Sequence, residues 1–172
     1  NFVQTKLIPA TEYKWFCATI NSQNPGRTII KTPPLTLPAP SVQVNSEESL
    51  TATEILINVQ GSYQVQCAAY LASDPEPSTS QVWNGRYRNG SPIPNLSPKQ
   101  TISSSTAGVY TQTGLKPGTR YAWYCATADS KSPKTERSTT DLRLNPPTLQ
   151  SETSESMDVA GSLYQGVVGR YR

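Results

Sequence analysis

Three cysteines and two asparagine sequons are the residues of this chain that could carry covalent chemistry. The cysteines are Cys17, Cys67 and Cys125, and an odd number leaves at least one thiol without an intramolecular partner. Asn89-Gly90-Ser91 and Asn95-Leu96-Ser97 both match the N-glycosylation pattern N-x-S. The predicted chemistry is therefore disulfide formation and glycan attachment, which are typical of secreted proteins.

The sequons have a simple alternative, because such triplets also arise by chance. Each is followed by a proline, Pro92 or Pro98, which weakens its use. Both nevertheless lie close together in a segment rich in Pro, Ser and Asn, which indicates an exposed loop. We therefore predict Asn89 and Asn95 as glycan attachment sites.

The same segment contains Trp83 and Tyr87, which could form an aromatic platform for a sugar or a peptide. We favour the alternative, in which Trp83 belongs to an edge strand and packs over a sheet. Asp74 and Glu76 could bind calcium weakly, but their spacing matches no dedicated calcium loop. No cofactor or metal is predicted.

Catalysis is disfavoured because histidine is absent from the sequence. Ser-His-Asp and Cys-His pairs and HExxH zinc sites are thereby excluded, and no glycine-rich phosphate loop is present. The net charge of +3 is small and its Lys and Arg residues are scattered, which does not indicate nucleic-acid binding. No apolar run approaches the roughly 20 residues that span a bilayer. We predict that the protein is not an enzyme.

The chain is organised by an internal repeat. The stretch Thr113–Thr127 (TGLKPGTRYAWYCAT) matches Thr5–Thr19 (TKLIPATEYKWFCAT) in one constant register, without insertions or deletions. Proline-rich linkers, Thr32–Pro40 and Leu144–Pro147, delimit the unit. Alternating residues and turn signals predict strands at Phe2–Lys6, Tyr13–Ile20, Thr28–Lys31, Ser41–Asn45, Ser49–Gln60, Ser62–Tyr70, Val109–Thr113, Tyr121–Ala128 and Glu136–Leu144.

Seven short strands per unit, with a Leu-x-Pro-x-Thr-x-Tyr turn, resemble the fibronectin type III β-sandwich. In that family the Leu packs under the turn, the Pro shapes it and the Tyr forms the tyrosine corner. The repeat departs from the family in being longer, with a long loop at 73–106, and in containing cysteines. By motif, these roles fall on Leu7, Pro9 and Tyr13, and again on Leu115, Pro117 and Tyr121.

The resemblance implies a disulfide, because it places Cys67 on strand C and Cys125 on the neighbouring strand F. The alternative is two buried free thiols. Cys17 would then be unpaired in this chain, with its partner in the strand C of a preceding repeat. The sequence also resembles cysteine-bearing repeats in extracellular proteins of algae and other protists.

These observations predict an all-β protein of tandem fibronectin type III-like sandwiches, one complete and two partial. Residues 1–34 would be strands E–G of one repeat, 35–145 a complete repeat, and 146–172 strands A–C of another. We predict a secreted, glycosylated structural protein of a fibre or stalk, in which copies join head to tail or adjacent repeats belong to one longer chain. The alternative is an adhesion ectodomain or a carbohydrate-binding module.

Overall fold

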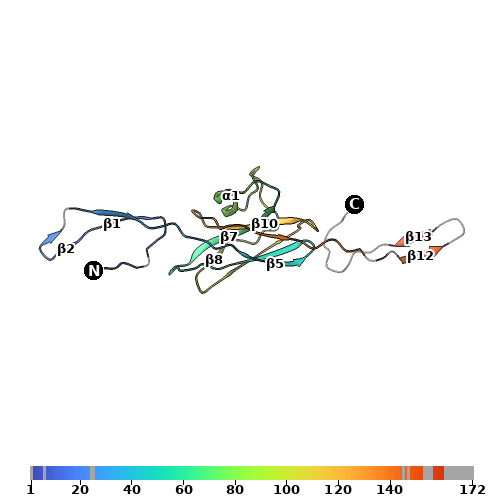
Figure 1. Ribbon diagram of the computed structural model, residues 1–172, viewed down its shortest axis with the longest axis horizontal. Helices are drawn as coiled ribbons and strands as arrows, with labels where there is room; N and C mark the ends of the chain where they lie inside the picture. The colour runs from blue at the N-terminus through green and yellow to red at the C-terminus, as the bar shows by residue number, and fades with distance from the viewer. Residues whose placement is uncertain are drawn as a thin grey trace.

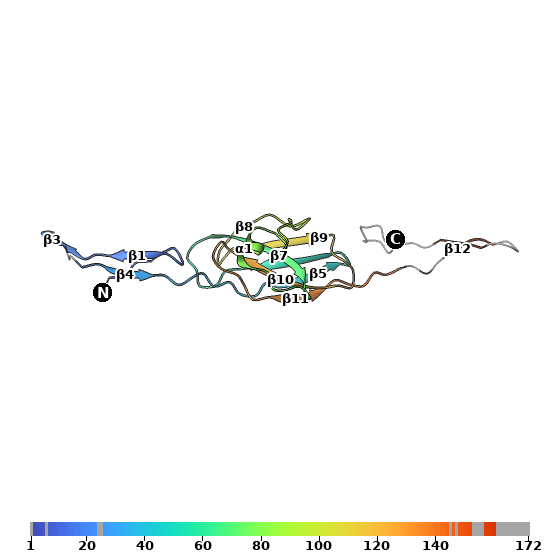
Figure 2. The same ribbon diagram turned by 90° about the horizontal axis from the view of Figure 1, so that it is seen from above.

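The computed structural model describes residues 2–5, 7–23, 26–144, 146, 148–152 and 157–160. Strands dominate this part of the chain, which confirms the all-β prediction. A central two-sheet sandwich carries a strand hairpin at each of two opposite ends (Figures 1 and 2). In the described residues no helix is long and apolar enough to cross a membrane.

The first sheet of the sandwich is antiparallel, in the order β5-β6-β9. It consists of β5 (Ser41–Ser46), β6 (Ser49–Glu54) and β9 (Gly108–Thr113). Side chains along β6 alternate between buried and partly exposed, as expected for a strand with one face on the core. The predicted strand continued to Gln60, but the observed one ends at Glu54, and Ile55 and Ile57 are exposed.

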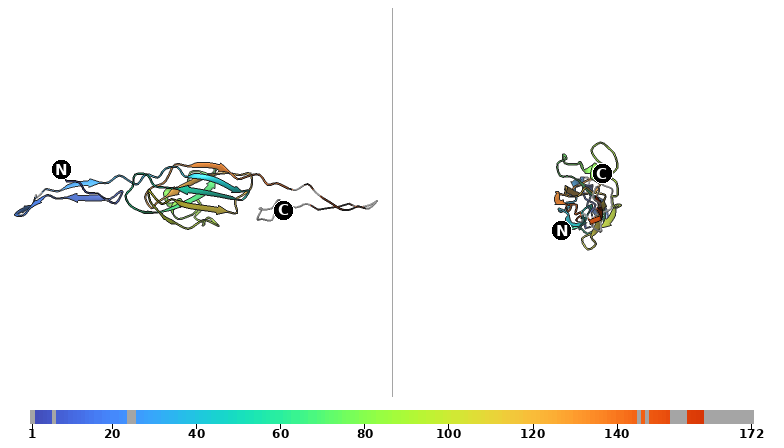
Figure 3. Two further views of the ribbon diagram at one scale, coloured as in Figure 1. Left: turned by 90° about the horizontal axis from the view of Figure 1, so that it is seen from below. Right: turned by 90° about the vertical axis from the view of Figure 1, so that its right-hand side faces the viewer.

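The second sheet has the order β11-β10-β7-β8. Its strands are β7 (Tyr63–Leu71), β8 (Gln100–Ile102), β10 (Arg120–Ala126) and β11 (Thr135–Ser138). Buried side chains of both sheets share one core, and Figure 3 shows the sandwich from below and from one end. This is the arrangement of a fibronectin type III-like sandwich.

The main core lies between the two sheets, around Trp123, Tyr110 and Leu50, which are fully buried. Leu115, predicted to pack under the turn, belongs to this core. So does Leu37, which is 2% exposed, and Leu35 packs against the same cluster. The segment predicted as a spacer therefore anchors in the sandwich, because its two leucines add apolar surface to the core.

The segment at 73–106 is a folded insertion. It contains the short helix α1 (Thr79–Trp83), which begins with a capping box formed by Ser78 and Gln81. Val82 and Ile93 of the insertion are buried against Tyr70 and Tyr124, which lie on the outer face of the second sheet. The predicted edge strand at Trp83 is thus wrong: the residue ends a helix, and the insertion covers the sheet with a second apolar core.

The N-terminal hairpin joins β1 (Glu12–Trp15) to β4 (Thr28–Lys31), and its tip pairs β2 (Ala18–Thr19) with β3 (Ser22–Gln23). The predicted strand at Phe2–Lys6 is not formed over residues 2–5. By the repeat it corresponds to β9, which pairs with β6 in the sandwich. No such strand lies beside residues 2–5 among the described residues, so their backbone groups lack a ladder partner there.

The hairpin at the other end joins β12 (Thr148–Glu152) to β13 (Met157–Ala160). By the repeat, its pairs Thr148↔Ala160 and Leu149↔Val159 correspond to Ser41↔Thr53 and Val42↔Ala52 of β5 and β6. The β12–β13 hairpin therefore has the same register as β5 and β6 of the sandwich. The predicted third strand of this unit lies outside the described residues.

Candidate functional site

The turn before β10 is a tyrosine corner held by hydrogen bonds. The backbone N–H of Lys116 donates to the hydroxyl of Tyr121 over 2.9 Å. The hydroxyl of Thr139 donates to the carbonyl oxygen of Lys116 over 2.7 Å and accepts from the backbone N–H of Thr119 over 3.0 Å. Tyr121 itself is buried. The corner therefore ties the start of β10 to the residue that follows β11.

The N-terminal hairpin repeats this network almost bond for bond. The N–H of Ile8 donates to the hydroxyl of Tyr13 over 2.7 Å. The hydroxyl of Thr32 donates to the carbonyl oxygen of Ile8 over 2.6 Å and accepts from the N–H of Thr11 over 3.0 Å. Even the left-handed backbone is kept, because Ala10 has φ 53° where Gly118 has φ 58°.

The threonine at the end of each hairpin was missed by sequence reasoning. Thr32 and Thr139 each bond to three backbone groups of their corner. Their separation along the chain is slightly shorter than that of Tyr13 and Tyr121, because the loop of the second hairpin is the shorter of the two. Because of this offset, Thr32 and Thr139 do not align when the two copies of the repeat are compared in one register.

Cys67 and Cys125 form a disulfide in the main core. They are directly opposite one another in the ladder between β7 and β10, and both are fully buried. Cys17, at the position equivalent to Cys125, is free and exposed. The disulfide therefore links the two central strands of the second sheet, while the repeated cysteine has no such neighbour among the described residues.

The N-terminal hairpin presents apolar side chains that the described part of the chain covers only in part. They line a groove of about 1100 Å³ that contains Leu7, Tyr13, Trp15 and Cys17. Trp15 is partly exposed, whereas its equivalent Trp123 is fully buried. The four named residues are the repeat equivalents of Leu115, Tyr121, Trp123 and Cys125, which are all buried in the sandwich.

Trp83 and Tyr87 pack against the same apolar cluster of the insertion but line two different cavities. The ammonium of Lys99 lies 3.5 Å from the centre of the Trp83 ring, a cation–π contact. Trp83 lines a small cavity beside Ile8 and Ala10 of the N-terminal hairpin. Tyr87 instead packs edge-to-face on Tyr70, with 6.3 Å between ring centres, and lines a different cavity.

Both sequon asparagines are exposed, but their surroundings differ. The side-chain oxygen of Asn89 accepts hydrogen bonds from the N–H and the hydroxyl of Ser91, at 3.0 and 2.6 Å. Ser97 of the second sequon is bound to the sheet, since its hydroxyl donates to the carbonyl oxygen of Thr111 and accepts from its N–H. The Asn89 sequon is therefore bonded within its own turn, whereas the Asn95 sequon is bonded to β9.

The acidic residues in the described part of the chain do not gather into a cluster. Glu76 pairs with Lys131 over 2.6 Å, and this contact holds the pKa of Glu76 below its usual value. No group of three or more His, Cys, Asp or Glu residues that could hold a metal occurs among the described residues. Glu54 is buried in β6, and burial raises its pKa to about 8.

Comparisons with known proteins found distant structural similarity only. No protein-family model matches the sequence, and no curated protein is recognisably similar to it. The crystal structure of chicken CNTN1 domains FN1–FN3 is similar with a TM-score of 0.38 and 17% identity, over 78% of this chain and 44% of that one. The rat CD45 extracellular region, domains d3–d4, gives a TM-score of 0.30 and 14% identity, over 80% of this chain and 67% of that one. The chain spans less than half the length of the CNTN1 chain, and it has distant structural similarity to tandem fibronectin type III domains.

Proposed function

We propose that this protein is a non-enzymatic structural component of an extracellular fibre or stalk, built from fibronectin type III-like repeats placed end to end. Residues 35–145 form the complete repeat. Residues 1–34 and 146–172 are halves that adjacent repeats complete. A buried disulfide supports an extracellular location, because disulfides persist in oxidising compartments.

One observation carries the proposal: repeat-equivalent residues are buried in the sandwich but exposed in the N-terminal hairpin and in the second linker. Cys125 is fully buried and Cys17 is exposed. Leu37 is 2% exposed, whereas Leu144, its equivalent in the second linker, is 66% exposed. Exposed apolar side chains at positions that fill a core elsewhere indicate surfaces that another part of an assembly covers.

The neighbouring repeat supplies the cover. In the sandwich, β11 lies beside β5, and the guanidinium of Arg137 donates to the carbonyl oxygen of Val42. The equivalent strands of the half-repeats are β4 and β12, which lie at opposite ends of the molecule (Figures 1 and 2). The sandwich stands between them, so each half is completed by a different neighbour. That neighbour is a second copy or an adjacent repeat of one longer chain. Head-to-tail interfaces that do not close into a ring build filaments.

Two measurements on native material test the proposal. Electron microscopy is expected to show a filament with a regular axial repeat, and isolated globular particles would refute the fibre. Intact mass under denaturing conditions separates the two arrangements: one species near 18.8 kDa plus glycans indicates separate copies, and a far larger one indicates a continuous chain. Glycopeptide mass spectrometry tests Asn89 and Asn95 as attachment sites.

A further inference from the structure

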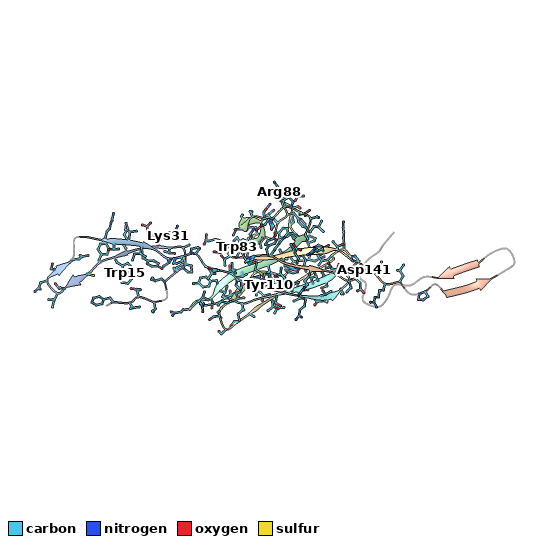
Figure 4. The ribbon with its side chains drawn as sticks, in the orientation of Figure 1. Trp15, Lys31, Trp83, Arg88, Tyr110 and Asp141 are labelled. Atoms are coloured by element: carbon cyan, nitrogen blue, oxygen red, sulfur yellow. A yellow bond between two sulfur atoms is a disulfide. The ribbon has the colours of Figure 1, made fainter. Side chains whose placement is uncertain are left out.

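The cavity beside Tyr87, here called the tyrosine cavity, is a second candidate site that the fibre proposal does not use. It has a volume of about 340 Å³, at the lower end of the range for small-ligand sites. It opens on the insertion, and Figure 4 shows Arg88 at the tip of this segment, away from Trp83. Its lining includes Tyr70, Asp74, Gln81, Tyr87, Arg88 and Asn89.

The walls of the tyrosine cavity are held in place by the surrounding fold. The hydroxyl of Tyr70 donates to the carbonyl oxygen of Arg86 over 3.1 Å. The backbone of Tyr87 both donates to Ser91 and accepts from Gly90, at 2.9 Å in each case. Gln81 is held by its part in the capping box of α1. The cavity is therefore preorganised, which reduces the ordering cost of binding.

Several polar groups of the cavity remain unused. Within the described residues, the carboxylate of Asp74, the guanidinium of Arg88 and the hydroxyl of Tyr87 make no hydrogen bond or ion pair. The amide nitrogen of Gln81 is also available, because the cap uses only its oxygen. One acid and one base leave the cavity without net charge, and it offers both donors and acceptors.

This combination fits a polyhydroxylated ligand. Tyr70 and Tyr87 line the cavity with aromatic carbon, an apolar surface against which the C–H groups of a sugar can pack. Carboxylate, guanidinium and amide groups at the edge match sugar hydroxyls, which both donate and accept. A free anion would face the carboxylate of Asp74, which disfavours it. We propose that the tyrosine cavity binds a neutral saccharide of one or two rings.

The site lies beside a predicted glycan attachment point, and this determines which material is tested. Asn89 itself lines the cavity, so a glycan attached there would begin at its edge. The unglycosylated full-length chain is therefore the proper sample. The inference does not depend on the fibre, because every residue of the cavity belongs to the complete sandwich and its insertion.

The test is a titration of the ¹⁵N-labelled chain with cellobiose, maltose, laminaribiose, mannobiose and chitobiose at millimolar concentrations. At least one disaccharide is expected to shift the amide signals of Asp74, Tyr87 and Arg88. Arg88→Ala is expected to weaken that binding about tenfold without affecting the fold, because Arg88 is exposed. Tyr87→Ala is expected to weaken it at least as much, with retention of the sandwich checked by the dispersion of the amide spectrum.

Two controls make the result specific. Trp83→Ala and Lys99→Ala remove an aromatic and a cation from the same insertion but outside the cavity, and both are expected to leave binding unchanged. The proposal is overturned if none of the five disaccharides shifts these signals, or if Arg88→Ala binds like the wild type. A proline-rich peptide that produces the shifts when no sugar does would overturn it in favour of peptide recognition.

Discussion

Glu54 is predicted to make the stability of the sandwich depend on pH. It is 1% exposed, on the inward face of β6, and neither carboxylate oxygen has a hydrogen-bond partner among the described residues. Burial raises the pKa of Glu54 from 4.5 to about 8, and Tyr110 is the titratable group that interacts with it. The carboxyl is therefore mainly protonated in the folded chain at neutral pH.

The sign and size of the effect follow from the linkage between protonation and folding. Between pH 4.5 and 8 the folded state holds the Glu54 proton and the unfolded state loses it, so the free energy of unfolding falls as the pH rises. Each unit of pKa shift is worth about 1.4 kcal/mol, which gives a loss of about 5 kcal/mol across this interval. Because the chain has no histidine, no other side chain with an ordinary pKa titrates near the middle of this range.

Urea unfolding followed by tryptophan fluorescence, repeated from pH 5 to pH 9, measures this loss. In Glu54→Gln the dependence on pH is expected to disappear, and at pH 9 the variant should be more stable than the wild type. Glu76→Gln is the matched control, because Glu76 is exposed and its pKa is lowered, so its contribution is lost only in acid. A wild-type stability that is flat from pH 5 to pH 8, or a slope that persists in Glu54→Gln, would show that the Glu54 carboxyl does not hold its proton in the folded chain.

Two further predictions concern the sandwich. Replacing Cys67 and Cys125 together by Ala is expected to lower the free energy of unfolding by about 4 kcal/mol, the chain-entropy value for the 58-residue separation, as measured by urea titration without reductant. Tyr121→Phe deprives the Lys116 N–H of its acceptor and should cost about 1 to 2 kcal/mol, whereas Tyr13→Phe, the equivalent change in the N-terminal hairpin, should leave unfolding of the sandwich unchanged. Equal effects of the two tyrosine changes would contradict the assignment of Tyr13 to a separate half-repeat.

Much of the sandwich could be predicted because its signals are local. Tyr63, Val65, Cys67 and Ala69 alternate along β7, and that period is enough to place a half-buried strand. The Tyr121 corner is similarly encoded in a few adjacent residues. What the alternation did not reveal is that β7 is buried on both faces: Ala68 and Tyr70, on the other side, are as buried as the first set.

The packing of the insertion on the sheet was not predicted, because the pattern that indicates it lies in β10 and not in the insertion itself. The run Tyr121–Ala126 is apolar at nearly every position, which is typical of a strand covered on both faces. The outer face of β10 therefore needs a covering segment, and residues 73–106 provide it. The Ser78–Gln81 spacing also matches a capping box, and it would have indicated α1. The tyrosine cavity could not be foreseen, since it depends on Tyr70 of β7 meeting Tyr87 of the insertion.

The two copies of the tyrosine corner distinguish hydrogen bonds that form within one hairpin from burial that requires a second sheet. In the N-terminal hairpin the Tyr13 and Thr32 hydrogen bonds are made although no sandwich surrounds them. Those bonds fix the register of β1 against β4, which matches that of β10 against β11. Burial of Trp15 and Cys17, by contrast, needs the opposite sheet. The corner hydrogen bonds therefore form within one hairpin, whereas burial of the apolar face requires a second sheet packed against it.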